Sequence, residues 1–241
     1  MIKFLSKNKS MVIVCGGKGK RMGKVLKKIP KAMIKLDNKT IIEHKINYYQ
    51  SQGIKNFIYC TGYKSKMLKT FLVKKNIEGV FNNAGLNAGI LKRIYSVKKF
   101  IKNNTIISYG DTLAKIKFKK LLKDHALSKC PITLVVAPIQ NPFGIVKWND
   151  NSLATSFSEK PTLNHFIGYA VISPNFFDSI PKKIINMNDG LGMIEAINLL
   201  IKKRKVNIFA FKELQITINS PDDLVKAKTK FNKYFTLDEN I

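Results

Sequence analysis

The stretch MVIVCGGKGKRMGKVLKKIPK, residues 11–31, decides the expected fold of this chain. It begins with an apolar run, Met11–Cys15, and continues into a glycine-rich loop made of Gly16, Gly17, Lys18, Gly19 and Lys20. Such a run is typical of a buried parallel strand, and open α/β sheets bind ligands at the carboxyl ends of their strands. Glycines let the backbone approach a bulky ligand, and the loop N–H groups can surround an anion. We therefore predict a nucleoside triphosphate site here, with positive charge added by Arg21 and Lys31.

The loop differs from the two common phosphate-binding motifs. It lacks the Gly-Lys-Ser/Thr ending of a P-loop. It also lacks the direct entry into a helix that a dinucleotide fingerprint requires, because a basic stretch interrupted by Pro30 follows. A glycine turn beside solvated lysines is the alternative interpretation of the motif taken alone.

The rest of the chain alternates between β-like and helix-like segments, which predicts an α/β fold. Expected strands are 11–15, 56–61, 78–81, 105–109, 132–138, 144–148, 153–158, 166–173 and 206–211. Expected helices are 39–52, with Asp37 or Asn38 as its start signal, then 64–74, 88–102, 118–127, 190–203 and 222–235. The pattern changes after Pro138, which indicates an inserted mixed or antiparallel portion. We expect one domain, residues 1–241, with a nucleotide-binding half (about 11–138) and an acceptor-binding half (about 139–230).

Three polar positions beside predicted elements could carry chemistry. Asp111 follows the strand 105–109, where a carboxylate suits Mg²⁺; an aspartate of an ordinary turn is the alternative. Lys160, between a strand and Pro161, is a fixed cation suited to a phosphate, or a surface turn. Asn219 precedes a helix for which Ser220 and Pro221 are good first residues, and its amide could assist a metal held by Asp111.

The overall charge is +28, from 43 basic and 15 acidic residues. Such a charge invites a nucleic-acid interpretation, but the lysines are scattered and no zinc-finger spacing or RNA-binding consensus is found, so we expect no nucleic-acid partner.

Cys15, Cys60 and Cys130 are far apart and are expected to be reduced core residues. No apolar stretch reaches membrane-spanning length and the opening residues do not resemble a signal peptide, so we expect a cytoplasmic protein without membrane insertion.

The order of five short motifs carries a family resemblance: GGKGKR, PK, YGD, SEKP and INSPDDL. In this order they resemble the sugar-phosphate nucleotidyltransferase family from Met11 to Lys228, and its glucose-1-phosphate cytidylyltransferase branch most closely. The resemblance implies a Rossmann-like, three-layer (GT-A-like) fold with a mixed, mainly parallel sheet. It also implies transfer of a nucleoside monophosphate to a phosphorylated small molecule, with Mg²⁺ as cofactor and pyrophosphate as the second product.

The resemblance further assigns roles to residues of this chain. Arg21 and Lys31 would hold the triphosphate, and Asp111 would be the principal Mg²⁺ ligand with Asn219 as the second. The nucleotide would contact Cys15, Gly16, Gly17, Lys18, Gly19, Lys20, Asn87, Ala88 and Gly89. The acceptor would contact Lys160, through its phosphate, and also Gly168 and Glu195.

Three departures from the family pattern leave the substrates open. Lys20 stands where a small hydroxyl residue is usual, Asn219 replaces a carboxylate, and Phe166 replaces an asparagine that contacts the sugar. CTP is the favoured nucleotide, with GTP and UTP as alternatives. The acceptor is a sugar 1-phosphate or a non-sugar phosphate such as a phosphocholine-like or phospho-amino-acid compound. A homo-oligomer is possible, and a nucleic-acid-binding protein on a degenerate transferase scaffold is the alternative of another class.

Overall fold

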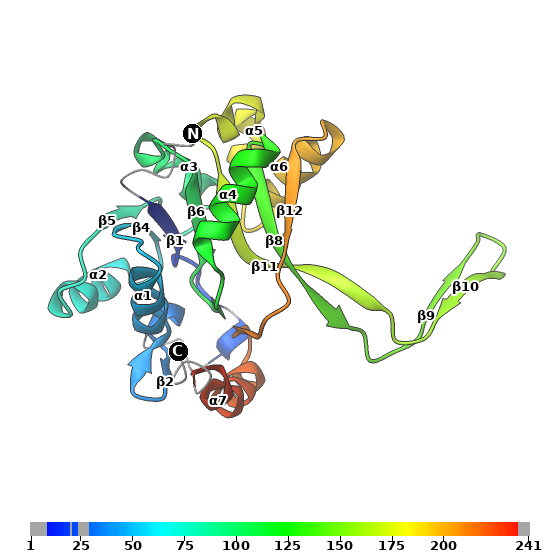
Figure 1. Cartoon of the computed structure of the whole chain (residues 1–241), viewed down its shortest axis with the longest axis horizontal. Coiled ribbons are helices and arrows are strands. Elements are labelled where there is room, and N and C mark those ends of the chain that lie inside the picture. The colour runs from blue at the N-terminus through cyan, green and yellow to red at the C-terminus, as the bar shows by residue number, and fades with distance from the viewer. Residues whose placement is uncertain (1–8, 20, 24–28, 236–241) are drawn as a thin grey trace.

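A seven-stranded, mixed sheet forms the centre of the computed structural model, which describes residues 9–19, 21–23 and 29–235 (Figure 1). The strand order across the sheet is β12 (Val206–Ala210), β8 (Ile132–Gln140), β11 (Thr162–Ile172), β6 (Thr105–Tyr109), β1 (Ser10–Val14), β4 (Asn56–Thr61) and β5 (Val80–Asn83). Every neighbouring pair is parallel except the two that involve β11. The expected mixed, mainly parallel sheet is therefore confirmed.

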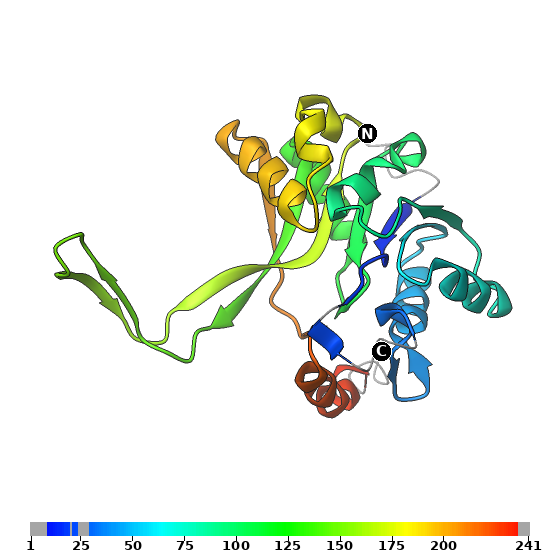
Figure 2. The same ribbon diagram turned by 180° about the vertical axis from the view of Figure 1, so that it is seen from behind.

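Helices cover both faces of this sheet and complete three layers (Figures 1 and 2). One layer contains α1 (Ile41–Ser51), α2 (Ser65–Lys74) and α4 (Phe118–Ser128); the other contains α3 (Ile90–Tyr95), α5 (Lys182–Ile185), α6 (Leu191–Lys202) and the 3-10 helix η4 (Pro174–Ser179). Strand β1 feeds both layers, because successive side chains point to opposite faces: Met11 and Ile13 join the first cluster and Val12 the second. A strand buried on both sides is apolar on both faces, as residues 11–14 of β1 are.

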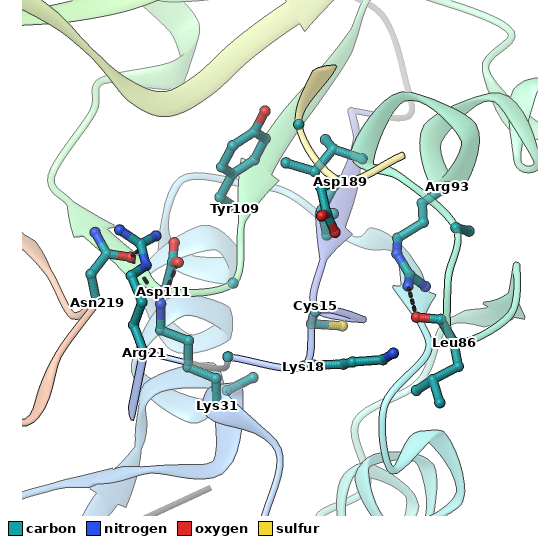
Figure 3. Close-up of a pocket in the computed structure, with 18 of the residues that line it drawn as sticks. Cys15, Lys18, Arg21, Lys31, Leu86, Arg93, Tyr109, Asp111, Asp189 and Asn219 are labelled. Carbon is teal, nitrogen blue, oxygen red and sulfur yellow. Dashed lines mark hydrogen bonds and ion pairs between the residues drawn. The ribbon is translucent and has the colours of Figure 1, made fainter. Parts of the chain in front are cut away.

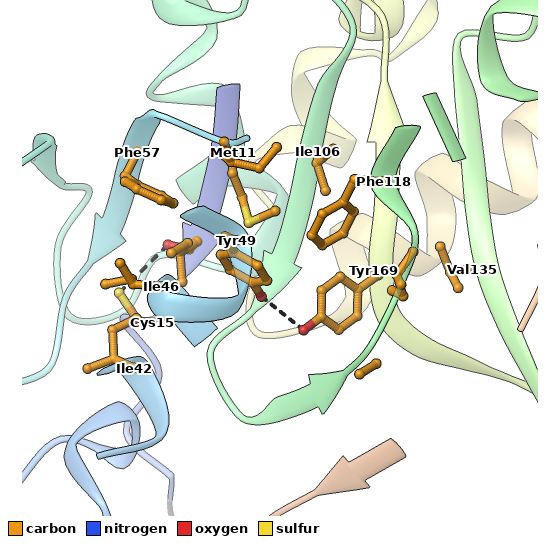
Figure 4. Packing of buried hydrophobic residues seen from close by; sticks show 14 of the residues in the cluster. Met11, Cys15, Ile42, Ile46, Tyr49, Phe57, Ile106, Phe118, Val135 and Tyr169 are labelled. Atoms are coloured by element: carbon orange, nitrogen blue, oxygen red, sulfur yellow. Dashed lines mark hydrogen bonds between the residues drawn. The ribbon is translucent and has the colours of Figure 1, made fainter. Parts of the chain in front are cut away.

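A buried polar network lies in the first core layer, and Figure 4 shows its bond between Tyr49 and Tyr169. The Tyr49 hydroxyl lies 2.9 Å from that of Tyr169, and the Lys45 amine donates to the Tyr169 hydroxyl at 3.0 Å. Lys45 is fully buried and also donates to the carbonyl of Thr112, the residue after Asp111. Because an unpaired buried amine would be costly, this network fixes the backbone beside Asp111.

Two helices differ from the sequence-based prediction. The first helix begins after Thr40, whose side chain forms a capping box with Glu43, because residues 35–40 form a small hairpin of β2 (Lys35–Leu36) and β3 (Lys39–Thr40). Asp37 lies in that turn with φ 54° and is not the helix start. The helix predicted over 88–102 runs only from Ile90 to Tyr95 and is followed by the 3-10 helix η3 (Lys98–Phe100), since the backbone of Val97 leaves helical geometry.

A small subdomain beside the sheet brings the C-terminal region to the end of β6. Strand β7 (Thr112–Ala114) pairs with β13 (Gln215–Thr217), and the N–H of Ile218 donates to the carbonyl of Asp111 at 3.0 Å. Helix α7 (Pro221–Phe235) follows directly, with the Ser220 hydroxyl accepting the N–H of Asp223, so the predicted start of this helix is confirmed. A third apolar cluster, including Met22, Leu113 and Ile218, fixes the subdomain to the body.

The insertion after Pro138 forms a long two-stranded extension that leaves the body (Figures 1 and 2). Strands β8 and β11 continue their antiparallel pairing to Gln140 and Thr162, and the hairpin of β9 (Ile145–Trp148) and β10 (Ala154–Ser158) follows beyond them.

All three cysteines are free; Cys15 and Cys60 are buried and Cys130 is partly exposed. Within the described residues, no helix combines the length and apolarity that a membrane crossing requires.

Candidate active site

A cavity of about 850 Å³ opens at the carboxyl ends of β1 and β6, where the sequence predicted a ligand site. Its wall is formed by the glycine-rich loop, the ends of β1 and β6, the loop before α3, the segment before α6, and Asn219. Among the sequence-predicted residues, those that line it are Cys15, Gly17, Lys18, Gly19, Arg21, Lys31, Asn87, Ala88, Asp111 and Asn219.

One end of the cavity contains a compact group of charged and amide side chains (Figure 3). The Lys31 amine lies 2.7 Å from the Asp111 carboxylate oxygen and 3.0 Å from the Asn219 amide oxygen. Arg21 reaches the same amide oxygen at 3.5 Å. Lys31 begins the 3-10 helix η2 (Lys31–Met33). The other three residues lie at positions 21, 111 and 219, so segments far apart in the chain supply these groups. We call Arg21, Lys31, Asp111 and Asn219 the phosphate-end cluster.

The oxygen atoms of this cluster fit a hard divalent cation. Lys31 places its ammonium between the oxygens of Asp111 and Asn219, which shows that both oxygens can face one positive charge. Carboxylate and amide oxygens are ligands that Mg²⁺ accepts, and Mg²⁺ commonly takes only one or two protein ligands beside substrate phosphates. The described residues contain no group of three or more His, Cys, Asp or Glu side chains that could hold a metal alone. A metal here would therefore complete its coordination with water and phosphate oxygens.

The start of α7 holds Asn219 in place. The Asp223 carboxylate accepts the N–H of Asn219 at 2.8 Å and that of Ser220 at 2.9 Å. Partial burial by itself would raise the pKa of Asp223, but these hydrogen bonds outweigh it and lower the pKa below its ordinary value. The Asn219 side chain thus leaves a fixed backbone, which favours a defined position for its amide oxygen.

Arg93 braces the glycine-rich loop from behind, a role that sequence reasoning missed. Its guanidinium is buried and donates to the carbonyls of Thr61 at 2.6 Å and Leu86 at 3.3 Å (Figure 3). It also explains Gly16, where a Cβ would lie 2.5 Å from the Arg93 Nη1 atom and 2.6 Å from the Thr61 backbone. Gly16 is therefore required for packing, whereas Gly17 faces the cavity with open space around it.

The thiol of Cys15 lines the cavity but is held in its neutral form. Burial raises its pKa to about 12, against smaller opposing effects of the Arg93 and Lys45 charges. Because only a thiolate is a strong nucleophile, the environment of Cys15 indicates a packing role. The described cavity wall includes no histidine.

The opposite end of the cavity combines the loop before α3 with the segment before α6. The Lys18 amine donates to the Asn87 amide oxygen at 2.9 Å, and Ala88 lies beside them. Gly89 precedes α3 and is itself not part of the wall; a Cβ there would lie 2.4 Å from the Met187 carbonyl. This tight contact brings Asn188 and Asp189 to the cavity, neither of which the sequence motifs indicated.

Tyr109 forms an aromatic wall beside Asp111. Its ring contacts Phe166 edge-on at a centroid distance of 5.6 Å. Gly168, with φ 78°, lies against Tyr109, since a Cβ at Gly168 would be 3.0 Å from the Tyr109 Cβ. Phe166 and Gly168, expected beside the acceptor, thus support Tyr109 from below the cavity wall. Tyr109 belongs to the YGD motif, but the motif by itself indicates only the carboxylate of Asp111 as a functional group.

The structure does not bring Lys160 or Glu195 to the cavity. Lys160 lies on the extension after β10 with its side chain 58% exposed and paired only with its neighbour Glu159, at 3.7 Å. Glu195 is on the exposed side of α6. Their predicted roles in acceptor binding have no support from their positions. Lys20 lies outside the described residues.

Comparisons with known proteins point to one protein family. The model of the family described as nucleotidyl transferase matches residues 10–198. A Bacillus subtilis protein named "Probable glucose-1-phosphate cytidylyltransferase" is 28% identical over 92% of this chain and 96% of its own length. A Campylobacter jejuni D-glycero-alpha-D-manno-heptose 1-phosphate guanylyltransferase is 28% identical over 88% of this chain and 95% of its own. The crystal structure of HddC from Yersinia pseudotuberculosis complexed with GMP-PN superposes with a TM-score of 0.71 at 22% identity, covering 92% of this chain and 99% of that one.

The family match spans the glycine-rich loop and Asp111, both of which line the cavity. The structural likeness independently supports the same fold. The chain belongs to the nucleotidyl transferase family.

Proposed function

We propose that this protein transfers a nucleoside monophosphate, CMP from CTP in the first instance, to a sugar 1-phosphate and releases pyrophosphate. The observation that carries the proposal is the phosphate-end cluster: two cations, a carboxylate and an amide oxygen meet beside a glycine-rich loop in one cavity. A site for two phosphorylated substrates must offset the repulsion between their negative charges, and this cluster supplies the positive charge for it.

The chemistry needs positioning more than proton transfer. An oxygen of the acceptor phosphate attacks the α-phosphorus of the triphosphate, and the bond from that phosphorus to the bridging oxygen of the β-phosphate breaks. The acceptor phosphate is already ionised at neutral pH, so no side chain has to remove a proton. This agrees with a described wall that lacks histidine and holds Cys15 as a neutral thiol.

Each residue of the cluster has a defined task in this proposal. Arg21 and Lys31 hold the phosphates in line and stabilise the charge that develops on the leaving pyrophosphate. Asp111, with Asn219, would hold Mg²⁺, which would supply further positive charge against the phosphates. With substrate in the site, the Lys31 ammonium would contact a phosphate in place of the Asp111 carboxylate.

The opposite end of the cavity is the proposed site of base and ribose. Asn87, held by Lys18, offers an amide to the polar edge of a base, and Gly89 lets the loop lie close to Met187. The relatives include both cytidylyl- and guanylyltransferases, so transfer of GMP is the second candidate. The ring face of Tyr109, beside Asp111, suits the apolar face of a sugar ring as the acceptor.

Pyrophosphate release with Mg²⁺ tests the proposal directly. CTP, GTP, UTP and ATP would be crossed with sugar 1-phosphates, phosphocholine and phosphorylated amino acids, and each reaction compared with Asp111→Ala. We expect turnover with CTP and one sugar 1-phosphate. Turnover with GTP alone would show that the nucleotide is GTP and would leave the proposed mechanism unchanged. Steeply salt-dependent nucleic-acid binding without pyrophosphate release would replace the proposal with the binding-protein alternative.

A further inference from the structure

The extension beyond the sheet has no partner within the described chain. We call residues 139–164 the arm; it comprises the ends of β8 and β11 and the β9–β10 hairpin (Figures 1 and 2). Every residue of β10 and all but the first of β9 are exposed. A two-stranded hairpin is marginally stable in water unless another surface packs against it. The arm therefore presents a surface that a further contact would stabilise.

One face of the hairpin is apolar. Val146 pairs with Phe157 across the strands, and Trp148 lies two residues from Val146 on the same face. The Trp148 side chain is 68% exposed and that of Phe157 67%. Farther along the arm Ile139 pairs with Leu163, and both are exposed, as are Phe143 and Leu153. Large aromatic side chains of this kind are enriched at the centres of protein interfaces.

The arm is also electrically neutral within a strongly basic chain. Between residues 139 and 164, Lys147 and Lys160 are balanced by Asp150 and Glu159, whereas the whole chain carries +28. A surface that binds nucleic acid or anionic lipid would instead concentrate lysines. Two copies of this chain repel each other over most of their surface, so they can approach where the charge is balanced. The charge distribution thus favours a second copy as the occupant of the arm.

The arm is preformed and large enough for such a contact. The N–H of Asn141 donates to the Pro161 carbonyl at 3.0 Å, and the Asn149 side chain accepts the N–H groups of Asn151 and Leu153, which fixes the hairpin turn. Its exposed apolar side chains offer on the order of several hundred Å², comparable with the roughly 800 Å² per partner of a standard interface. A turn that is already hydrogen-bonded leaves less conformational entropy to lose on binding.

We propose that two copies of this chain associate through their arms, with the Val146, Trp148 and Phe157 face of each buried against the other. A twofold arrangement lets the same patch serve both chains. The proposal does not depend on the nucleotide or the acceptor.

Trp148 is the single tryptophan of the chain, so its fluorescence reports on the arm alone. The test combines sedimentation velocity with Trp148 emission and iodide quenching, over a dilution series at low and high salt. We expect the mass of two chains with a shielded, blue-shifted Trp148 at high concentration. On dilution we expect a single chain with an exposed Trp148. High salt should strengthen the association, because it screens the repulsion between the bodies.

Matched variants decide whether the arm is responsible. Phe157→Glu should shift the dissociation constant at least tenfold toward single chains, and the far-ultraviolet circular dichroism should stay unchanged. Leu127→Glu, at an equally exposed apolar side chain on α4, should leave association unaltered. A single chain with exposed Trp148 at all concentrations would refute the proposal. A single chain with shielded Trp148 would show instead that the arm folds onto its own body, and a dimer with exposed Trp148 would place the interface elsewhere.

Discussion

The phosphate-end cluster and the arm are built on opposite principles. In the cluster, side chains from β1's loop, η2, the end of β6 and the start of α7 meet through contacts of 2.7–3.5 Å, above two fully packed core layers. The arm makes its own ladder, and its aromatic side chains lie mostly in solvent. The first region is held by contacts within one chain, whereas the second leaves its apolar side chains exposed.

This difference shows where short motifs are informative. A binding loop at the end of a buried strand is positioned by the core under it, so its sequence predicts its place. A motif on an extension has no such support, so its sequence does not predict its place. The SEKP motif, residues 158–161, shows this, because it lies on the arm and away from the cavity.

Removing a charge from the cluster should have the largest effect. We expect Lys31→Ala and Asp111→Ala each to lower kcat at least about a hundredfold, as removal of one electrostatic stabiliser does in other enzymes. Steady-state pyrophosphate release measures this, with the melting temperature of each variant as the control for folding. Retention of more than a tenth of the wild-type rate by either variant would contradict the assigned roles.

The two adjacent glycines of the loop should differ in their tolerance of alanine. Gly16→Ala drives a Cβ against the Thr61 backbone and should reduce the free energy of unfolding by about 1–3 kcal/mol. Gly17→Ala meets open space and should unfold at nearly the wild-type denaturant concentration. Urea titration of the pair gives the comparison; equal midpoints would show that Arg93 does not pack the loop as described.

Substitutions at Asn219 should change the metal requirement. Asn219→Asp adds a charged oxygen beside Asp111 and should lower the Mg²⁺ concentration for half-maximal activity by roughly tenfold. Asn219→Ala should raise it by a similar factor while the melting temperature stays within a few degrees of the wild type. A Mg²⁺ dependence that is identical in all three proteins would exclude Asn219 from the metal site.

Lys160→Ala should have the smallest effect, although its sequence context resembles a phosphate-holding motif. With its side chain exposed on the arm, we expect kcat/KM for the acceptor to change by less than about threefold, the scale of an exposed charge. Lys31→Ala, measured in the same assay, is the matched loss of a lysine inside the cavity. A selective rise of the acceptor KM by tenfold or more would restore the sequence-based role of Lys160.

Much of the phosphate end could be predicted because its parts are encoded locally. An apolar run that stops at Gly16, and Asp111 at the end of another strand, both point to the carboxyl edge of a parallel sheet. The structure brings Asp111, Lys31 and Asn219 together at one end of the cavity, beside the glycine-rich loop. The start of α7 could be predicted for the same reason, since Ser220, Pro221 and Asp223 lie within four residues of one another in the chain.

Arg93, Tyr109 and Asp189 were missed for the opposite reason. Arg93 is one cation among 43, and only its buried contacts with Thr61 and Leu86 distinguish it. Tyr109 faces the cavity because Phe166 and Gly168 of β11 lie beneath it, which depends on the pairing of β11 with β6. Asp189 reaches the wall because its segment packs on Gly89. Pairings between distant segments leave no local trace in the sequence.

The sequence by itself determined the strand–loop unit, the α/β alternation and the charged residues at strand ends, because these follow from hydrophobic periodicity and backbone chemistry over a few residues. Only the tertiary structure decided which distant side chains share the cavity, that Arg93 supports the loop, and that Lys160 belongs to the arm. Those outcomes depend on strand register and core packing over the whole chain, which bring together residues that lie up to 198 positions apart, as Arg21 and Asn219 do.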